Sequence, residues 1–347
     1  LIAGFDMQFH EKRRQQFLSE RQYLAELTRL PSSIAYFAAH PVGSGATALH
    51  RDMLARLTSA EECFDHLALR YTAGDPIEPL RSDLEKVIAA YERYADLLWQ
   101  YKADRNEPTF AFDVLDDYCQ LMQVVGLCFL LHRRDLLPRI AAMQDGVDAI
   151  GQTGQGMGGA DWVFEEFMSL AIGPENRYES ETIHWDKPYE ALADALSSVD
   201  NDAALGDLDR FLKRWYKDLS GTAWHDSHKP NENGDQGGYH GYWSFEAGAA
   251  VLLLGIEDDS SLHKYLYYPK DLVTWAREHA VLSADPSSNV EHVRLRCEAG
   301  QPCPRDGEWE TPALANSRRS FKQGEIMPSV EGDYGQTIWQ WVGESDV

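Results

Sequence analysis

A stripe of apolar residues at helical spacing constrains the fold of this chain more than any other feature of its sequence. The stripe consists of Leu80, Leu84, Val87, Tyr91, Tyr94, Leu98 and Tyr101. Steps of three and four residues place all of them on one face of an α-helix, with charged residues between. Shorter stripes occupy residues 17–30 and 53–71, and the breaker Gly74-Asp75-Pro76 follows the second. Long helices with short connections predict antiparallel packing, so we expect a mainly α protein built of helical bundle domains.

Two further segments predict buried helices, and the character of the sequence changes near the C-terminus. Residues 110–131 and 241–255 are rich in apolar and small residues, which is typical of core helices. Pro269 is expected to open the last helix, because the first helical position needs no backbone N–H. After Asp285 short alternating runs separated by glycine and proline predict a small β-rich appendage. We expect an N-terminal helical domain in residues 1–185, a C-terminal helical domain in 186–285 and the appendage in 286–347.

The composition is that of a globular protein without a membrane span. Of the 347 residues, 44% are hydrophobic and 25% are charged, and no apolar run approaches the roughly 18 residues that a transmembrane helix needs. The first ten residues lack the pattern of a signal peptide. The cysteines are Cys63, Cys119, Cys128, Cys297 and Cys303. Their odd number and scattered positions argue against a disulfide framework and for a reducing compartment, so we expect a cytoplasmic protein.

Negative charge is concentrated in one part of the chain. The formal net charge is −24, which argues against direct binding of nucleic acid, because such binding requires Lys and Arg to neutralise phosphates. Between Asp145 and Asp209 fifteen acidic residues stand against two basic ones, Arg177 and Lys187. The region is either a solvated face that keeps the protein in solution or a surface that attracts a basic partner protein. The candidate partner-binding residues are Glu165, Glu166, Glu175, Glu179, Glu181, Asp186, Asp200, Asp202, Trp162 and Tyr178.

A histidine-containing loop is the strongest sign of enzymatic chemistry in the sequence. His225 and His228 flank Asp226, and His240 follows in the same loop region. Such a set could hold a divalent metal for a hydrolase, although ligands on a loop lack the rigid support that metal sites usually have. Cys297 and Cys303, with His292 nearby, are a weaker candidate pair. We expect no metal and no cofactor, and interpret the histidines as surface groups.

Glu246 and a glycine-rich stretch also admit both a functional and a structural interpretation. Glu246 lies in the apolar helix predicted after Gly241, and a buried carboxylate needs a hydrogen-bond donor such as a Tyr hydroxyl or a Trp indole. Residues 151–159 are rich in glycine but lack the preceding strand and the Lys-Ser/Thr ending of a phosphate loop, so we interpret them as a connection between helices. No nucleophile elbow, His-Glu-x-x-His pair or Cys-x-x-Cys pair occurs, and we expect a protein that is not an enzyme.

Two motifs in the second helical block carry a resemblance to a known family. They are Gly241-Tyr242-Trp243-Ser244-Phe245-Glu246-Ala247-Gly248-Ala249 and Tyr267-Tyr268-Pro269-Lys270-Asp271-Leu272. They resemble the signature of the PoNi-type immunity proteins, which are partners of polymorphic nuclease toxins. The tail segments 303–304, 321–328 and 338–341 are similar to a tail carried by immunity proteins associated with type VI secretion effectors. The motif residues expected to determine the fold are Tyr242, Trp243, Phe245, Glu246, Tyr268 and Pro269.

The resemblance implies a cytoplasmic helical inhibitor that protects its host from a DNase toxin and has no catalytic residues. With the acidic region, it leads to the hypothesis of an immunity protein that binds a basic toxin, since a nuclease presents positive charge to its substrate. A homo-oligomer is compatible with this hypothesis. The alternatives are a metal-dependent hydrolase that uses His225, His228 and His240, and a helical scaffold that binds host proteins.

Overall fold

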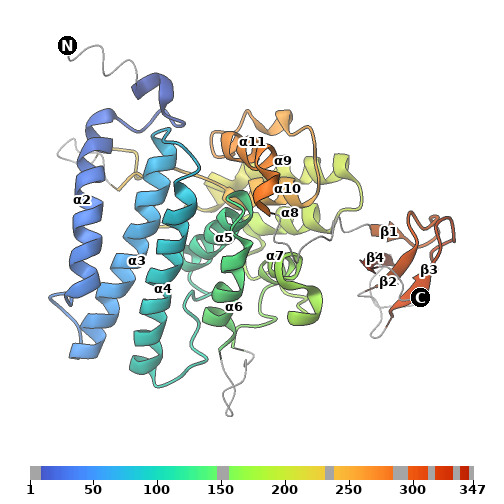
Figure 1. Ribbon diagram of the computed structural model, residues 1–347, viewed down its shortest axis with the longest axis horizontal. Coiled ribbons are helices and arrows are strands. Elements are labelled where there is room, and N and C mark those ends of the chain that lie inside the picture. The colour runs from blue at the N-terminus through green and yellow to red at the C-terminus, as the bar shows by residue number, and fades with distance from the viewer. Residues whose placement is uncertain are drawn as a thin grey trace.

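The computed structural model describes residues 9–146, 156–230, 238–283, 296–311, 317–330 and 337–343. Helices form most of it, and a small antiparallel sheet lies at the C-terminal end, so the predicted mainly α fold with a β-rich appendage is confirmed (Figure 1). The longer helices are α2 (Glu20–Ala39), α3 (Ala48–Thr72), α4 (Leu80–Lys102), α5 (Leu115–Leu130), α6 (Leu137–Asp145), α7 (Trp162–Ile172), α8 (Asp186–Ser197), α9 (Asn201–Asp218), α10 (Phe245–Leu253) and α11 (Lys270–Glu278).

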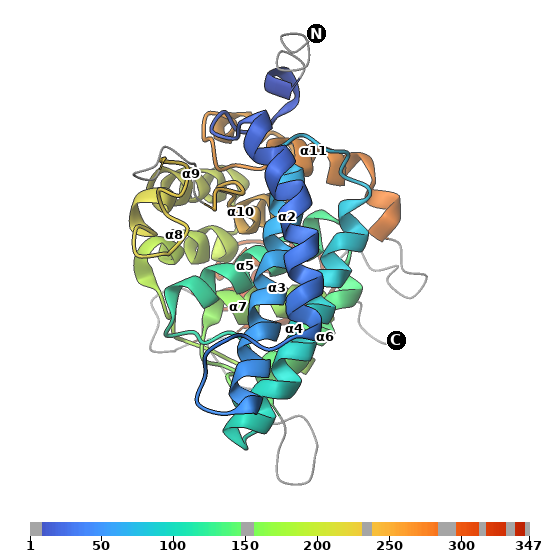
Figure 2. The same ribbon diagram turned by 90° about the vertical axis from the view of Figure 1, so that its left-hand side faces the viewer.

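Helices α2, α3 and α4 lie side by side at the N-terminal end of the molecule (Figures 1 and 2). Side-chain caps start the first two, because Ser19 accepts a hydrogen bond from Gln22 N and Thr47 accepts one from His50 N. The predicted stripe of α4 faces inward, and its members Leu84, Val87 and Tyr91 are buried. The 3.6-residue period therefore identifies both the helix and the face that packs against α3.

Helices α5 and α10 form the centre of the helical body. Gly126 of α5 meets α10 so closely that a Cβ there would lie 2.6 Å from the carbonyl carbon of Phe245. Gly248 of α10 likewise leaves no room for a Cβ, which would lie 2.8 Å from Pro269 Cγ. The small residues of this segment thus allow close helix contact. The predicted helices at 110–131 and 241–255 exist, although their bounds are Leu115–Leu130 and Phe245–Leu253.

The remaining helices complete one continuous core. Helices α8 and α9 pack on each other and on α10, and α11 begins directly after Pro269 as predicted. Buried apolar residues from Phe9 to Val273 belong to a single hydrophobic cluster. The division of the helical part at residue 185 stays a prediction. Among the described residues, no helix is long and apolar enough to cross a membrane.

The C-terminal sheet has its own small core. Its strands are β1 (Arg296–Glu298), β2 (Gly307–Glu310), β3 (Arg319–Phe321) and β4 (Ile338–Gly343), in the order β1-β4-β2-β3 with antiparallel neighbours. Trp309, Trp339 and Trp341 are buried there together with Cys297 and Cys303. Both of these cysteines are free thiols.

Candidate functional site

Two of the predicted partner-binding carboxylates lie in the protein interior. Glu165 is 4% exposed and accepts a hydrogen bond of 2.9 Å from Arg177 Nε. The same guanidinium donates from Nη1 to Asp145 Oδ2 at 2.6 Å. The Arg177 side chain itself is 1% exposed. Glu166 is also buried and pairs with Arg296 Nη2 at 2.9 Å. Both carboxylates stabilise the fold by neutralising buried arginines, so they are not part of any surface that a partner could reach.

The Glu166–Arg296 pair also joins the appendage to the helical body. Arg296 opens strand β1, and its guanidinium donates to the backbone oxygen of Leu196 at the end of α8 as well as to Glu166 on α7. A charged side chain from the sheet is thus buried against two helices. This contact with Arg296 explains why Glu166 is buried although it lies in the acidic region between Asp145 and Asp209.

The other acidic candidates remain on the surface. Glu175, Glu179, Glu181, Asp186, Asp200 and Asp202 are exposed. Asp200 has a local structural role, since its carboxylate caps α9 by accepting from the backbone N–H groups of Asp202 and Ala203. Trp162 and Tyr178 are half-buried, and the Tyr178 ring lies 5.4 Å from the Arg177 guanidinium. We refer to the six exposed carboxylates as the 175–202 acidic set.

The three candidate metal ligands of the histidine loop do not converge. His225 stacks on Tyr216, with 4.1 Å between ring centroids, and His228 Nδ1 lies 2.8 Å from Tyr242 Oη. His240 lies instead between two carboxylates, 3.2 Å from Asp65 and 3.3 Å from Glu26. Within the described ranges, no three His, Cys, Asp or Glu side chains are arranged to hold a metal ion.

The family-motif residues are all buried. Tyr242, Trp243, Phe245, Glu246, Tyr268 and Pro269 lie in the interior. Trp243 Nε1 donates to Thr72 Oγ1 at 2.8 Å, which fastens the start of this segment to the end of α3. Glu246 accepts a hydrogen bond of 2.8 Å from the Trp215 indole, so the expected indole partner of this carboxylate is present. Burial raises the pKa of Glu246 to about 7.

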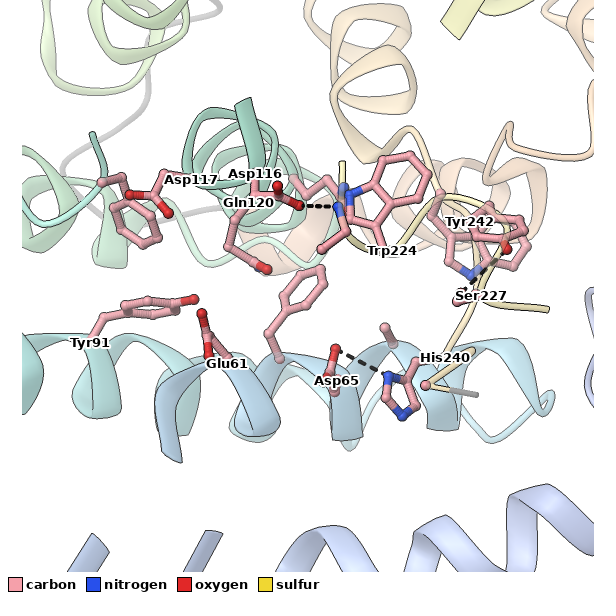
Figure 3. A pocket seen from close by; sticks show the side chains of 18 of the residues that line it. Glu61, Asp65, Tyr91, Asp116, Asp117, Gln120, Trp224, Ser227, His240 and Tyr242 are labelled. Atoms are coloured by element: carbon pink, nitrogen blue, oxygen red, sulfur yellow. Dashed lines mark hydrogen bonds and ion pairs between the residues drawn. The ribbon is translucent and has the colours of Figure 1, made fainter. Parts of the chain in front are cut away.

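The structure also contains an acidic cleft that the sequence did not reveal. It has a volume of about 240 Å³ and lies between α3, α4, α5 and the chain around residues 223–227 and 238–243 (Figure 3). Glu61 and Asp65 on α3 face Asp116 and Asp117 on α5 across it. The i, i+4 spacing of Glu61 and Asp65 indicates a shared helix face. Nothing in the sequence indicates that α5 lies opposite, because that contact is tertiary.

The four cleft carboxylates differ in whether the protein supplies them with a hydrogen-bond or ion-pair partner. Asp116 accepts from Ala223 N at 2.8 Å, Asp117 accepts from Ala111 N at 3.0 Å, and Asp65 pairs with His240. Glu61 has no hydrogen-bond or ion-pair partner within the described part of the chain. Its side chain is open to solvent in the cleft but is surrounded by protein and by acidic groups. Burial and the charges of Asp65, Asp117 and Asp116 raise the pKa of Glu61 to about 7.

His240 at the edge of the cleft carries positive charge through the neutral range. Burial alone lowers its pKa, but the carboxylates of Asp65 and Glu26 outweigh that effect and raise the pKa to about 9. The hydrogen bond from His240 in turn lowers the pKa of Glu26 to about 2. This histidine is therefore an ionic link between α2, α3 and the start of the motif segment.

Comparisons with known proteins address the family and the fold. Residues 159–272 match the family described as PoNe immunity proteins (PoNi), C-terminal. The crystal structure of protein PA2201 from Pseudomonas aeruginosa is similar in fold, with a TM-score of 0.57 and 19% sequence identity over 80% of this chain and 98% of that chain. No curated protein matches the chain. The matched residues contain both motifs that resemble those of the PoNi-type immunity proteins, so the family match supports that resemblance.

Proposed function

We propose that this chain is an immunity protein that binds a cognate DNase toxin and neutralises it in the cytoplasm of the cell that makes both. The observation that carries the proposal is the match of residues 159–272 to the C-terminal region of the PoNe immunity proteins. Within it, Glu246 and the aromatic motif residues are buried and serve the fold. The residues that contact a toxin must therefore be sought on the surface around them.

Charge supports a basic partner. A DNase presents positive side chains to the phosphates of its substrate, and a protein with a net charge of −24 attracts such a surface at long range. The 175–202 acidic set remains exposed after the buried pairs of Glu165 and Glu166 are set aside. We assign to this set the role of accelerating association, since exposed charges affect encounter rates more than final affinity. The type of effector, for which we propose one delivered by type VI secretion, rests on the tail resemblance alone.

A metal-dependent hydrolase is less well supported. His225, His228 and His240 each face a different protein group, and His240 is held as a cation between carboxylates, a state that does not bind metals. A helical scaffold without a toxin would explain the fold but not the family match.

Co-expression tests the proposal. The product of the toxin gene adjacent to the gene of this chain is induced in cells with and without the chain, and survival and chromosomal DNA integrity are measured. We expect survival only in cells that make this chain. Equal killing in both strains contradicts the proposal, and protection by a variant that does not bind the toxin in a pull-down would favour an indirect role.

A further inference from the structure

The acidic cleft between α3 and α5 has the composition of a binding site for a cation. Glu61, Asp65, Asp116 and Asp117 line it, and its described lining includes no Lys or Arg. His240, the one lining histidine, is already shared between Asp65 and Glu26. Negative charge on both walls thus exceeds what the protein itself neutralises. Like charges at this proximity destabilise the empty cleft and favour any cation that enters it.

Two uncharged polar groups are also left without partners in the cleft. Tyr91 is 2% exposed, its hydroxyl points toward Glu61, and it has no hydrogen-bond partner within the described ranges (Figure 3). Gln120 Nε2 on α5 is likewise buried and unpartnered among the described residues. Buried polar groups are normally satisfied by protein, water or ligand. Both groups are independent of the acidic cluster, and both line the cleft, where a bound group could meet them.

The walls suit a long basic side chain better than a bare metal ion. Leu57, Phe64 and Ala68 supply apolar surface that can cover a methylene stem, and the Trp224 ring lies at the same cleft. Arg and Lys bury their stems against apolar groups while their charged ends meet carboxylates or aromatic rings. A hydrated divalent cation makes no use of such surface.

We propose that this cleft receives a lysine or arginine side chain of the toxin, which ends between Glu61 and Asp117 with its stem against Phe64. The inference rests on the proposed function for the source of the side chain. The cleft then acts as an anchor point of the complex, while the 175–202 acidic set acts mainly on the encounter. A desolvated pair in a concave site affects dissociation, whereas exposed charges affect association.

The test compares two double variants of equal charge. At pH 8, above the pKa of Glu61, Glu61→Gln with Asp117→Asn removes two cleft charges and keeps an acceptor for Ala111 N, so the fold is retained. Glu257→Gln with Glu278→Gln removes two exposed charges outside the cleft lining. Binding to the adjacent-gene toxin is measured by surface plasmon resonance. We expect the cleft variant to lose roughly tenfold or more in affinity, mainly through faster dissociation, and the control to change by less than about threefold.

The outcomes separate the inference from the proposed function. If the wild-type chain does not bind the toxin, the proposed function fails. If it binds and the two variants bind equally well, the cleft is not an anchor and the inference alone is overturned.

A second arm examines the cleft without any toxin. N-acetyl-arginine methylamide is titrated into the full chain while the NMR signals of the Tyr91 ring and the Trp224 indole are followed, with N-acetyl-norleucine methylamide as the uncharged probe. We expect saturable shifts with the arginine probe that disappear in the cleft variant. Shifts of the same size with the norleucine probe, or shifts that persist in the cleft variant, overturn the inference.

Discussion

The Trp215 indole nitrogen donates a hydrogen bond of 2.8 Å to Glu246 Oε1, and this contact joins helix α9 to helix α10 inside the core. Both side chains are 1% exposed. Burial raises the pKa of Glu246 to about 7, so the folded protein holds a proton on this carboxyl where the unfolded chain has released it. The stability of the core is therefore coupled to pH through one residue of the family motif.

Glu246→Gln is predicted to remove this pH dependence. The pKa of Glu246 rises from an ordinary value of 4.5 to about 7 on folding, so its contribution to stability is present at low pH and is lost as pH rises between these values. Gln stays neutral and still accepts from Trp215. We expect the free energy of unfolding of the variant, relative to wild type, to increase by about 1–3 kcal/mol between about pH 5 and about pH 8, measured with urea. If the free energies of unfolding of the two proteins differ by the same amount across this pH range, Glu246 is not the source of the pH dependence.

Arg177→Ala is predicted to destabilise the protein strongly. The variant leaves Glu165 and Asp145 as buried carboxylates without their cation. Removing one partner of a buried pair typically costs about 3–5 kcal/mol. Glu179→Ala, an exposed member of the same acidic region, is the control and should change stability by less than about 0.5 kcal/mol. Equal urea midpoints for the two variants would show that the Arg177 network does not support the fold.

His240→Gln is predicted to lower the stability of the protein at acidic and neutral pH but not above about pH 9. The pKa of His240 rises from 6.5 to about 9 on folding because of Asp65 and Glu26, so its ionic contribution is complete below 6.5 and disappears as pH rises to about 9. The loss in the variant should be about 1–3 kcal/mol near pH 6 and should shrink toward zero above about pH 9. Thermal unfolding at several pH values provides the measurement. A deficit that is as large at high pH as at low pH would show that packing, and not charge, is what the histidine contributes.

Reversal of the 175–202 acidic set is predicted to slow association with the toxin. Glu179 and Glu181 are changed together to Lys, and Glu257 and Glu278, which are also exposed, are changed to Lys as a control with the same change in net charge. We expect association to slow by roughly tenfold at low salt and the difference to shrink at high salt, where exposed charges are screened. Stopped-flow measurement of the association rate checks this. If the control reversal slows association by the same factor, only net charge matters and the set has no special role.

Local patterns in the sequence predicted the helices well, because a period of 3.6 residues reports which face of a segment is buried. The stripe from Leu80 to Tyr101 is such a case. The start of α5 was placed too early by five residues because Phe110 N bonds to the Gln144 side chain and Thr109 N to Met143 O. These bonds to a distant segment hold the chain out of the helix, and no nearby residue signals them.

The candidate site was predicted less completely, since charge counting does not distinguish buried from exposed carboxylates. Glu165 and Glu179 look alike in the sequence, yet only Glu165 meets Arg177, twelve residues away and on no common helix face. The expectation of an indole partner for Glu246 could be made because an apolar helix surrounds this carboxylate. The cleft around Glu61 could not be found, because its two walls come together only when α3 and α5 pack.

The most direct measurement is a titration of the purified adjacent-gene toxin with this protein while DNA cleavage is followed. We expect cleavage to fall linearly and to stop at one equivalent of the chain, and we expect active toxin to be recovered when the complex is dissociated. Cleavage that continues unchanged in excess protein would contradict neutralisation by binding. Loss of toxin activity at far below one equivalent would instead reveal an enzyme.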